Sequence, residues 1–102
     1  MSGYIKEVSL VPNFGGVAQK VTVGAASSAA SAAFTEDCYV LVTTKVEVFM
    51  RTGLSGTTPT AVPDTDQILL ANNSYRVGPV AKNSNLAFYS VAGGDVFITP
   101  QA

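Results

Sequence analysis

Three groups of carboxylates are the residues that come closest to supporting chemistry in this sequence: adjacent Glu36 and Asp37, then Asp64 and Asp66, then Asp95. Neighbours on a strand point to opposite faces, so the adjacent pair cannot work as acid and base and is expected at a turn or strand entry. The second pair could touch a calcium ion, but it lacks the further oxygen ligands of a calcium loop. Asp95 follows two glycines and is expected to cap backbone N–H groups of a turn. No metal site is predicted.

Nucleophiles and bases are scarcer still, because the chain has no histidine and a single cysteine, Cys38. Without histidine there is no Ser-His or Cys-His pair, and one cysteine cannot build a zinc site. Cys38 opens an apolar run with Tyr39 and Val40, where a free cysteine packs as a small hydrophobe. No glycine-rich phosphate-binding motif occurs. We expect a protein that is not an enzyme, has no catalytic residue or cofactor, and keeps Cys38 buried and unreactive.

Charge is sparse along the whole chain. Charged residues make up 13% and hydrophobic residues 47% of the 102 residues, against a usual charged share of about 25%. Interface centres are depleted in charge, so this composition predicts a surface partly covered by partner proteins. The net charge is −1, and the six cations stand apart in the sequence, which argues against nucleic acid as a partner: Lys6, Lys20, Lys45, Arg51, Arg76 and Lys82.

The sequence has no sign of export or membrane insertion. Its first residues lack a basic start followed by a long apolar core, which a signal peptide requires. No apolar run approaches the ~20 residues that span a bilayer. A single cysteine cannot form an intrachain disulfide, which fits synthesis in a reducing cytoplasm. We expect neither a membrane nor a small-molecule substrate as partner.

Period-two patterns predict strands in the middle of the chain. In Val46–Arg51 every second residue is apolar, and Phe49 interrupts the polar face, so that face is expected to be partly covered too. The continuous apolar run Cys38–Val42 predicts a strand buried on both faces. Thr43–Lys45 between them is expected to form the turn of a hairpin, unless one long bent strand spans both segments.

Two further hairpins are predicted from strand-forming runs that flank turn residues. They are Leu86–Val91 with Val96–Thr99 around Ala92–Asp95, and Gln67–Leu70 with Ser74–Val77 around Asn72–Asn73.

The N-terminal third is less regular. Tyr4–Val11 predicts a strand or arm, and a turn follows at Asn13–Gly16. Val17, Val21 and Val23 are expected on one strand face. Ala25–Ala33 consists of alanine and serine and suits a helix by propensity, but its strand-like neighbours favour a strand.

The longest irregular stretch, Thr52–Asp66, has the Gly, Pro, Ser, Thr and Asp content of an exposed loop, and a loop of this length is often functional. The remaining pattern predicts an all-β fold, a single-domain β-sandwich or jelly roll over residues 1–102 with about seven or eight short antiparallel strands. Residues 1–11 would form an N-terminal arm or strand.

Several stretches together resemble small head decoration, or cement, proteins of tailed bacteriophages. The resemblance covers residues 25–99 and is one of layout. It rests on these segments: Ser28–Phe34, Cys38–Val42, Arg51–Gly53, Thr57–Ala61, Ile68–Ala71, Tyr75 and the closing Gly93-Gly94 turn.

The resemblance implies a structural virion protein that is made in the host bacterial cytoplasm, sits on the outer surface of the capsid and bridges adjacent major capsid protein subunits. Because loops carry binding function, the interface is expected in the long loop and the N-terminal arm, at Tyr4, Ile5, Leu54, Thr57, Thr58, Pro59, Thr60 and Val62. A homo-oligomer is expected, with a trimer favoured over a dimer. Two alternatives stay open: a phage tail, neck or fibre-attachment protein, and a carbohydrate-binding β-sandwich module.

Overall fold

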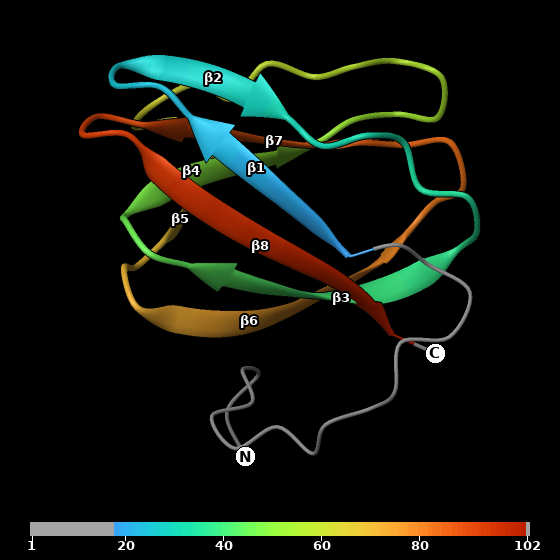
Figure 1. The fold of residues 1–102 in the computed structure, drawn as a ribbon. Coiled ribbons are helices and arrows are strands. Elements are labelled where there is room, and N and C mark those ends of the chain that lie inside the picture. The colour runs from blue at the N-terminus through green and yellow to red at the C-terminus, as the bar shows by residue number, and fades with distance from the viewer. Residues whose placement is uncertain (1–17, 102) are drawn as a thin grey trace.

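The computed structural model describes residues 18–101, which form eight strands and no helix (Figure 1). In chain order they are β1 (Gln19–Val23), β2 (Ser27–Ala30), β3 (Cys38–Thr44), β4 (Val48–Thr52), β5 (Gln67–Leu69), β6 (Asn73–Val80), β7 (Leu86–Ser90) and β8 (Gly94–Gln101). The first sheet has the order β1-β8-β3-β6, and the second sheet has the order β2-β7-β4-β5. All neighbours within the two sheets are antiparallel. The expected all-β fold is confirmed.

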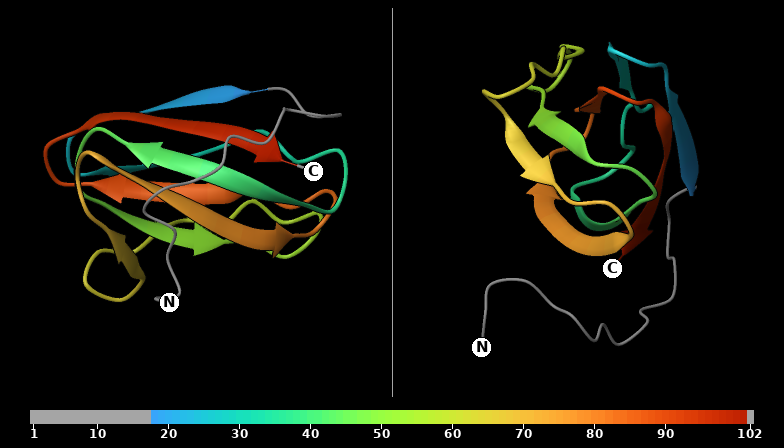
Figure 2. Two further views of the ribbon diagram at one scale, coloured as in Figure 1. Left: turned by 90° about the horizontal axis from the view of Figure 1, so that it is seen from below. Right: turned by 90° about the vertical axis from the view of Figure 1, so that its left-hand side faces the viewer.

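The strand pairing is nested around the β4–β5 loop (residues 53–66). β4 pairs with β5, β3 with β6, β2 with β7 and β1 with β8, as if one long hairpin had been folded and rolled up. Rolling adds the β3·β8 and β4·β7 pairs that complete the two sheets. This is the connectivity of an eight-stranded jelly roll, one of the two arrangements that the strand count predicts. Figure 2 shows the two layers, with β1 and β8 on the side opposite β4 and β5.

All three predicted hairpins are wrong in the same way. Chain reversals do occur at residues 45–47, 70–72 and 91–93, but each one carries the chain from one sheet to the other. β3 and β4, β5 and β6, and β7 and β8 therefore do not pair with each other. Thr43 and Thr44 belong to β3, and no continuous strand runs from Cys38 to Arg51. Turn residues mark where the chain reverses, but they do not determine whether the two strands share a sheet.

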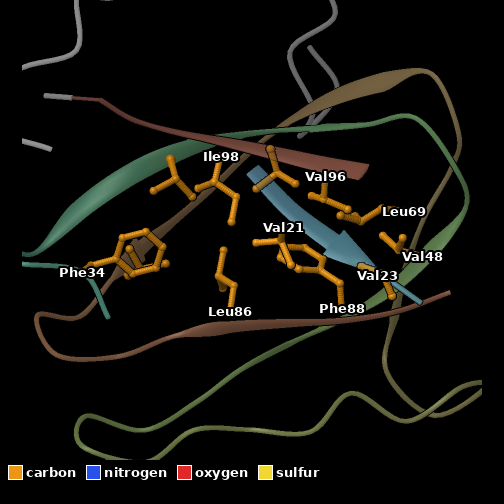
Figure 3. Close-up of a cluster of buried hydrophobic side chains, with 12 residues drawn as sticks. Val21, Val23, Phe34, Val48, Leu69, Leu86, Phe88, Val96 and Ile98 are labelled. Atoms are coloured by element: carbon orange, nitrogen blue, oxygen red, sulfur yellow. The ribbon is translucent and has the colours of Figure 1, made fainter. Parts of the chain in front are cut away.

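The core lies between the two sheets. Figure 3 shows Val96 and Ile98 of the first sheet facing Leu86 and Phe88 of the second, and all four side chains are fully buried. In β3, burial alternates: Val40 and Val42 point into the core, whereas Tyr39 is exposed and Leu41 is half-buried. The expectation that Cys38–Val42 is buried on both faces is therefore wrong, since the outward-facing Tyr39 is 37% exposed and Leu41 is only half-buried.

The Ala/Ser segment contains strand β2 and no helix. Ser27–Ala30 pairs with β7, and Ala29 lies opposite Phe88 and packs on the core. In β1, Val21 and Val23 are buried and Lys20 and Thr22 are exposed, as the alternation predicts.

The remaining N-terminal predictions, Tyr4–Val11, Asn13–Gly16 and Val17, lie outside the described residues. Within residues 18–101 the chain has no helix long and apolar enough to cross a membrane.

Candidate protein-binding surfaces

The β4–β5 loop is closed at its base by Arg51 and Asp66. Arg51 Nε donates to both carboxylate oxygens of Asp66, at 2.9 and 3.0 Å, and Arg51 Nη2 lies 2.9 Å from Oδ1. Asp66 Oδ2 also accepts the backbone N–H of Val62 at 2.7 Å. The Arg51 hydrogen bond and then the Val62 hydrogen bond hold the pKa of Asp66 below its ordinary value. Asp66 thus fastens the loop to β4, and its oxygens are occupied by protein donors.

The middle of this loop folds back over the outside of the second sheet. The backbone N–H of Ala61 donates to Ser28 Oγ at 3.1 Å, and Ser28 lies on β2, at the sheet edge opposite β5 (Figure 1). Ala61 is 3% exposed, and Phe49 and Ala87, which face outward from β4 and β7, are also buried. These three residues are separate from the central core cluster. The loop therefore covers this sheet, as the interrupted polar face of β4 predicts for Phe49.

The start of the loop forms a turn over residues 53–57, which we call the Leu54 turn. Gly53 N–H donates to Asn85 O and Gly56 N–H to Asn83 O, both at 2.9 Å. Within the turn, Thr57 N–H donates to Leu54 O at 2.9 Å. The side chain of Leu54 itself is 80% exposed. Backbone hydrogen bonds on both sides thus fix a large apolar side chain in contact with water.

Neighbouring connections support the Leu54 turn. The β6–β7 connection accepts the hydrogen bonds that the turn donates. This connection in turn donates to the β2–β3 connection, from Asn83 N–H to Phe34 O and from Lys82 N–H to Asp37 Oδ1. Phe34 is buried beneath them. Glu36 and Asp37 lie in this connection outside any strand, as predicted. Three connections therefore form one hydrogen-bonded end of the sandwich.

The long loop holds most of the predicted interface residues together, and the structure places them as follows. Leu54, Thr57, Thr58, Thr60 and Val62 are exposed and Pro59 is partly buried, whereas Tyr4 and Ile5 lie outside the described residues. Gly53 permits the loop to turn back on itself, because a Cβ there would lie 2.6 Å from Pro59 Cδ and from Thr57 O.

A second surface, the outer face of the first sheet, was not predicted. Tyr39 on β3 and Phe97 on β8 are 37% and 36% exposed, although both are aromatic residues within strands. The guanidinium of Arg76, on β6, lies 4.2 Å from the centroid of the Tyr39 ring. Tyr39, Leu41 and Thr43 are every second residue of β3 and share its outward face. This period of two could have revealed the surface, but the continuous apolar run Cys38–Val42 obscured it.

Two predictions for single residues need correction. Asp95 accepts the Thr22 hydroxyl at 2.9 Å, whereas the turn N–H of Gly93 donates to Ser90 Oγ. Asp95 therefore joins β8 to β1, and its carboxylate does not cap the turn. Cys38 is half-buried rather than buried, and burial, followed by the charges of Glu36 and Asp37, raises the pKa of its thiol.

Residues 18–101 contain no group of three or more Cys, Asp or Glu side chains arranged to hold a metal ion. Comparison of the chain with known proteins finds no matching family model, no matching curated protein and no matching solved structure.

Proposed function

We propose that this chain is a structural protein of a tailed bacteriophage that binds the outside of the assembled head and bridges adjacent major capsid protein subunits. The proposal is supported by the layout of residues 25–99, which resembles decoration proteins, and by the jelly-roll connectivity, which recurs in viral capsid proteins. A jelly roll also serves lectin domains, so the fold alone does not select the function.

The observation that carries the proposal is the exposed Leu54 on its hydrogen-bonded turn. Full burial of a leucine side chain contributes about 1.5–3 kcal/mol. When a side chain or loop is flexible, the entropic cost of ordering it on binding offsets part of this free energy, at about 0.5–1.5 kcal/mol for each immobilised side chain. The backbone of the Leu54 turn is already fixed, so insertion of Leu54 into a partner's pocket would retain most of the free energy of its burial. We infer that Leu54 enters an apolar pocket on the capsid.

Bridging would stabilise the capsid, because binding of the protein is thermodynamically linked to capsid assembly. A protein that binds the assembled shell, and not free subunits, stabilises the shell by mass action. A stable interface buries about 1,600 Å² in total, so a domain of this size must use more than one face or several copies. A closed trimer would match the local three-fold axes of a shell, and light scattering of the purified protein measures that state.

The test uses phage heads prepared without the protein and then supplied with it. We expect added protein to raise the temperature and the osmotic shock at which heads rupture. Leu54→Ala should weaken binding by at least tenfold, whereas Val91→Ala should bind as the parent does. Val91 is a matched control because it is 67% exposed and lies in the β7–β8 connection, at the opposite end of the sandwich.

Two results would overturn the proposal. Heads that rupture at the same temperature and shock with and without the protein would contradict cementing. Binding to tails and not to heads would replace it with the tail, neck or fibre-attachment alternative.

A further inference from the structure

The two outer faces of the sandwich differ in what covers them. The β4–β5 loop lies over the second sheet and buries Phe49 and Ala87. Figure 2 shows this loop on the side away from β1 and β8. On the first sheet the corresponding aromatic residues, Tyr39 and Phe97, remain more than one-third exposed. The first sheet therefore presents apolar side chains that no described segment covers.

Strand register places these apolar side chains in the middle of the face. Leu41 lies opposite Thr99 of β8 and Arg76 of β6, and Phe97 lies opposite Thr43 of β3. Tyr39, Leu41 and Phe97 thus occupy the two central strands of the first sheet. Thr43 and Ser74 hydroxyls hydrogen-bond each other at 2.9 Å beside them, which gives the apolar stripe a polar border.

Cations stand on the two edge strands of the same face. Lys20 lies on β1 opposite Phe97, and Arg76 lies on β6 opposite Leu41. The guanidinium of Arg76 is held over the Tyr39 ring at 4.2 Å, and both cationic residues are exposed. The acidic residue that faces outward from β8, Asp95, accepts a hydrogen bond from Thr22. The described part of the face is therefore a central apolar stripe between two cations.

We propose that the outer face of the first sheet binds an acidic, partly apolar segment of a partner protein. Apolar side chains of the segment would pack on Phe97 and Leu41, and carboxylates would pair with Lys20 and Arg76. A carboxylate is the natural partner of a guanidinium, which it binds with two parallel hydrogen bonds. The inference goes beyond the proposed function, because it concerns a different surface from the Leu54 turn and does not depend on which particle is bound.

Strand geometry sets the spacing of the carboxylates. Lys20 and Arg76 are three strands apart and one outward-facing row apart, so about 14 Å separates them across the sheet and about 7 Å along it. Residues i and i+4 of an extended segment share one face and lie about 13 Å apart at roughly 3.3 Å per residue, and the long Lys, Arg and Glu side chains span the remaining distance of about 3 Å out of a total of about 16 Å. A peptide with glutamates at these positions and leucine between them is therefore the appropriate probe.

The area of the outer face of the first sheet limits its affinity for the segment. Four strands of these lengths present roughly 400 Å², about half of the 800 Å² that each partner contributes to a standard stable interface. We therefore expect weak binding by this face alone. Two cations also release few counterions, so nucleic acid is a poor match.

The experiment is an NMR titration of the ¹⁵N-labelled protein with the peptide described above. We expect shifts confined to amides of β1, β8, β3 and β6 that carry the outward-facing residues. Glutamine in place of both peptide glutamates should weaken binding at least tenfold. The double variant Lys20→Glu/Arg76→Glu should do the same.

The control is Lys45→Glu/Lys82→Glu, which changes the net charge equally at two exposed connections and should bind the peptide as the parent does. Absence of shifts on the first sheet, or equal loss in both double variants, would overturn the proposal. Shifts of the same amides with an acidic oligosaccharide, without any with the peptide, would assign the face to glycans instead. Each of these readings holds whether or not the protein strengthens phage heads.

Discussion

Arg51 and Asp66 are 15 residues apart in the sequence, yet three N–O distances of 2.9–3.0 Å join their side chains across the base of the β4–β5 loop. Arg51 ends the outward-facing row of β4, and Asp66 precedes β5 directly. Asp66 also accepts Val62 N–H. One carboxylate thus links β4 to the segment that carries Ala61 across the second sheet, so its charge state should control how firmly the loop is held.

The first prediction is a pH dependence that Asp66 creates. Because the folded-state pKa of Asp66 is lowered, chiefly by Arg51, its ionised form favours the folded state. This stabilisation is present above the ordinary aspartate pKa of about 3.9 and is lost as the pH falls through the lowered folded value. Asp66→Asn should therefore lower the Tm at neutral pH, and the difference from the parent should shrink below about pH 4.

Asp64→Asn is the matched control, since it removes the same charge two residues before Asp66. Asp64 is exposed, and its positive φ is one that asparagine tolerates. Thermal unfolding followed by circular dichroism at a series of pH values measures all three proteins. A difference between Asp66→Asn and the parent that stays constant down to pH 2 would contradict the role of the ionised carboxylate.

The second prediction concerns the contact between the loop and β2. Ser28→Ala removes the acceptor of the Ala61 N–H, which should cost about 0.5–1.5 kcal/mol and speed hydrogen exchange of the Ala61 amide. Ser27→Ala should leave that amide unchanged, because neighbouring residues of a strand point to opposite faces. Equal protection of Ala61 in both variants would show that the loop is held without Ser28.

The third prediction contrasts two phenylalanines of the sandwich. Phe88 is fully buried between the sheets, and Phe97 is 36% exposed on the outer face of the first sheet. Phe88→Ala should cost about 3–5 kcal/mol through lost burial and a residual cavity. Phe97→Ala should cost less than about 2 kcal/mol, because it leaves no closed cavity. Urea denaturation measures both, and equal costs would place Phe97 in the core.

Nested pairing explains which parts of the fold the sequence could predict. Apolar and strand-forming runs identified β3, β7 and β8, and alternation identified β4, since both signals lie in the residues of the strand itself. Pairing partners could not be predicted in the same way. β1 and β8 pair across almost the whole described chain, and nothing in their residue types distinguishes such a partner from the neighbour along the chain.

The candidate surfaces follow the same rule. Exposure of residues 54–58 and of Thr60 could be predicted from the Gly, Pro, Ser and Thr content of the loop alone. The attachment of the loop to β2 could not, because Ala61 and Ser28 are 33 residues apart and neither type is distinctive. Arg76 and Tyr39 likewise meet only because β6 pairs with β3.

The fourth prediction concerns Cys38. Burial, and after it the charges of Glu36 and Asp37, raises the pKa of its thiol, so less thiolate is present at a given pH and labelling by a thiol reagent should be slow. Glu36→Gln should speed labelling of the folded protein, and Glu47→Gln should not. Labelling in urea gives the reference rate for the exposed thiol. Folded protein that labels as fast as unfolded protein would contradict this account.

The last prediction separates backbone strain from steric clash at two glycines. Gly56 and Gly93 have φ values of +81° and +82°, in the region that L side chains rarely adopt. A Cβ at Gly56 would meet nothing within 4 Å, whereas a Cβ at Gly93 would lie 2.9 Å from Ala25 N and 3.0 Å from Val23 O. Gly56→Ala should cost about 1–2 kcal/mol, the conformational penalty alone. Gly93→Ala should cost more, because the β7–β8 reversal must move away from the backbone that joins β1 to β2. Urea unfolding of the two variants measures the difference. Equal costs would mean that the β1–β2 and β7–β8 connections can move apart without a further cost in free energy.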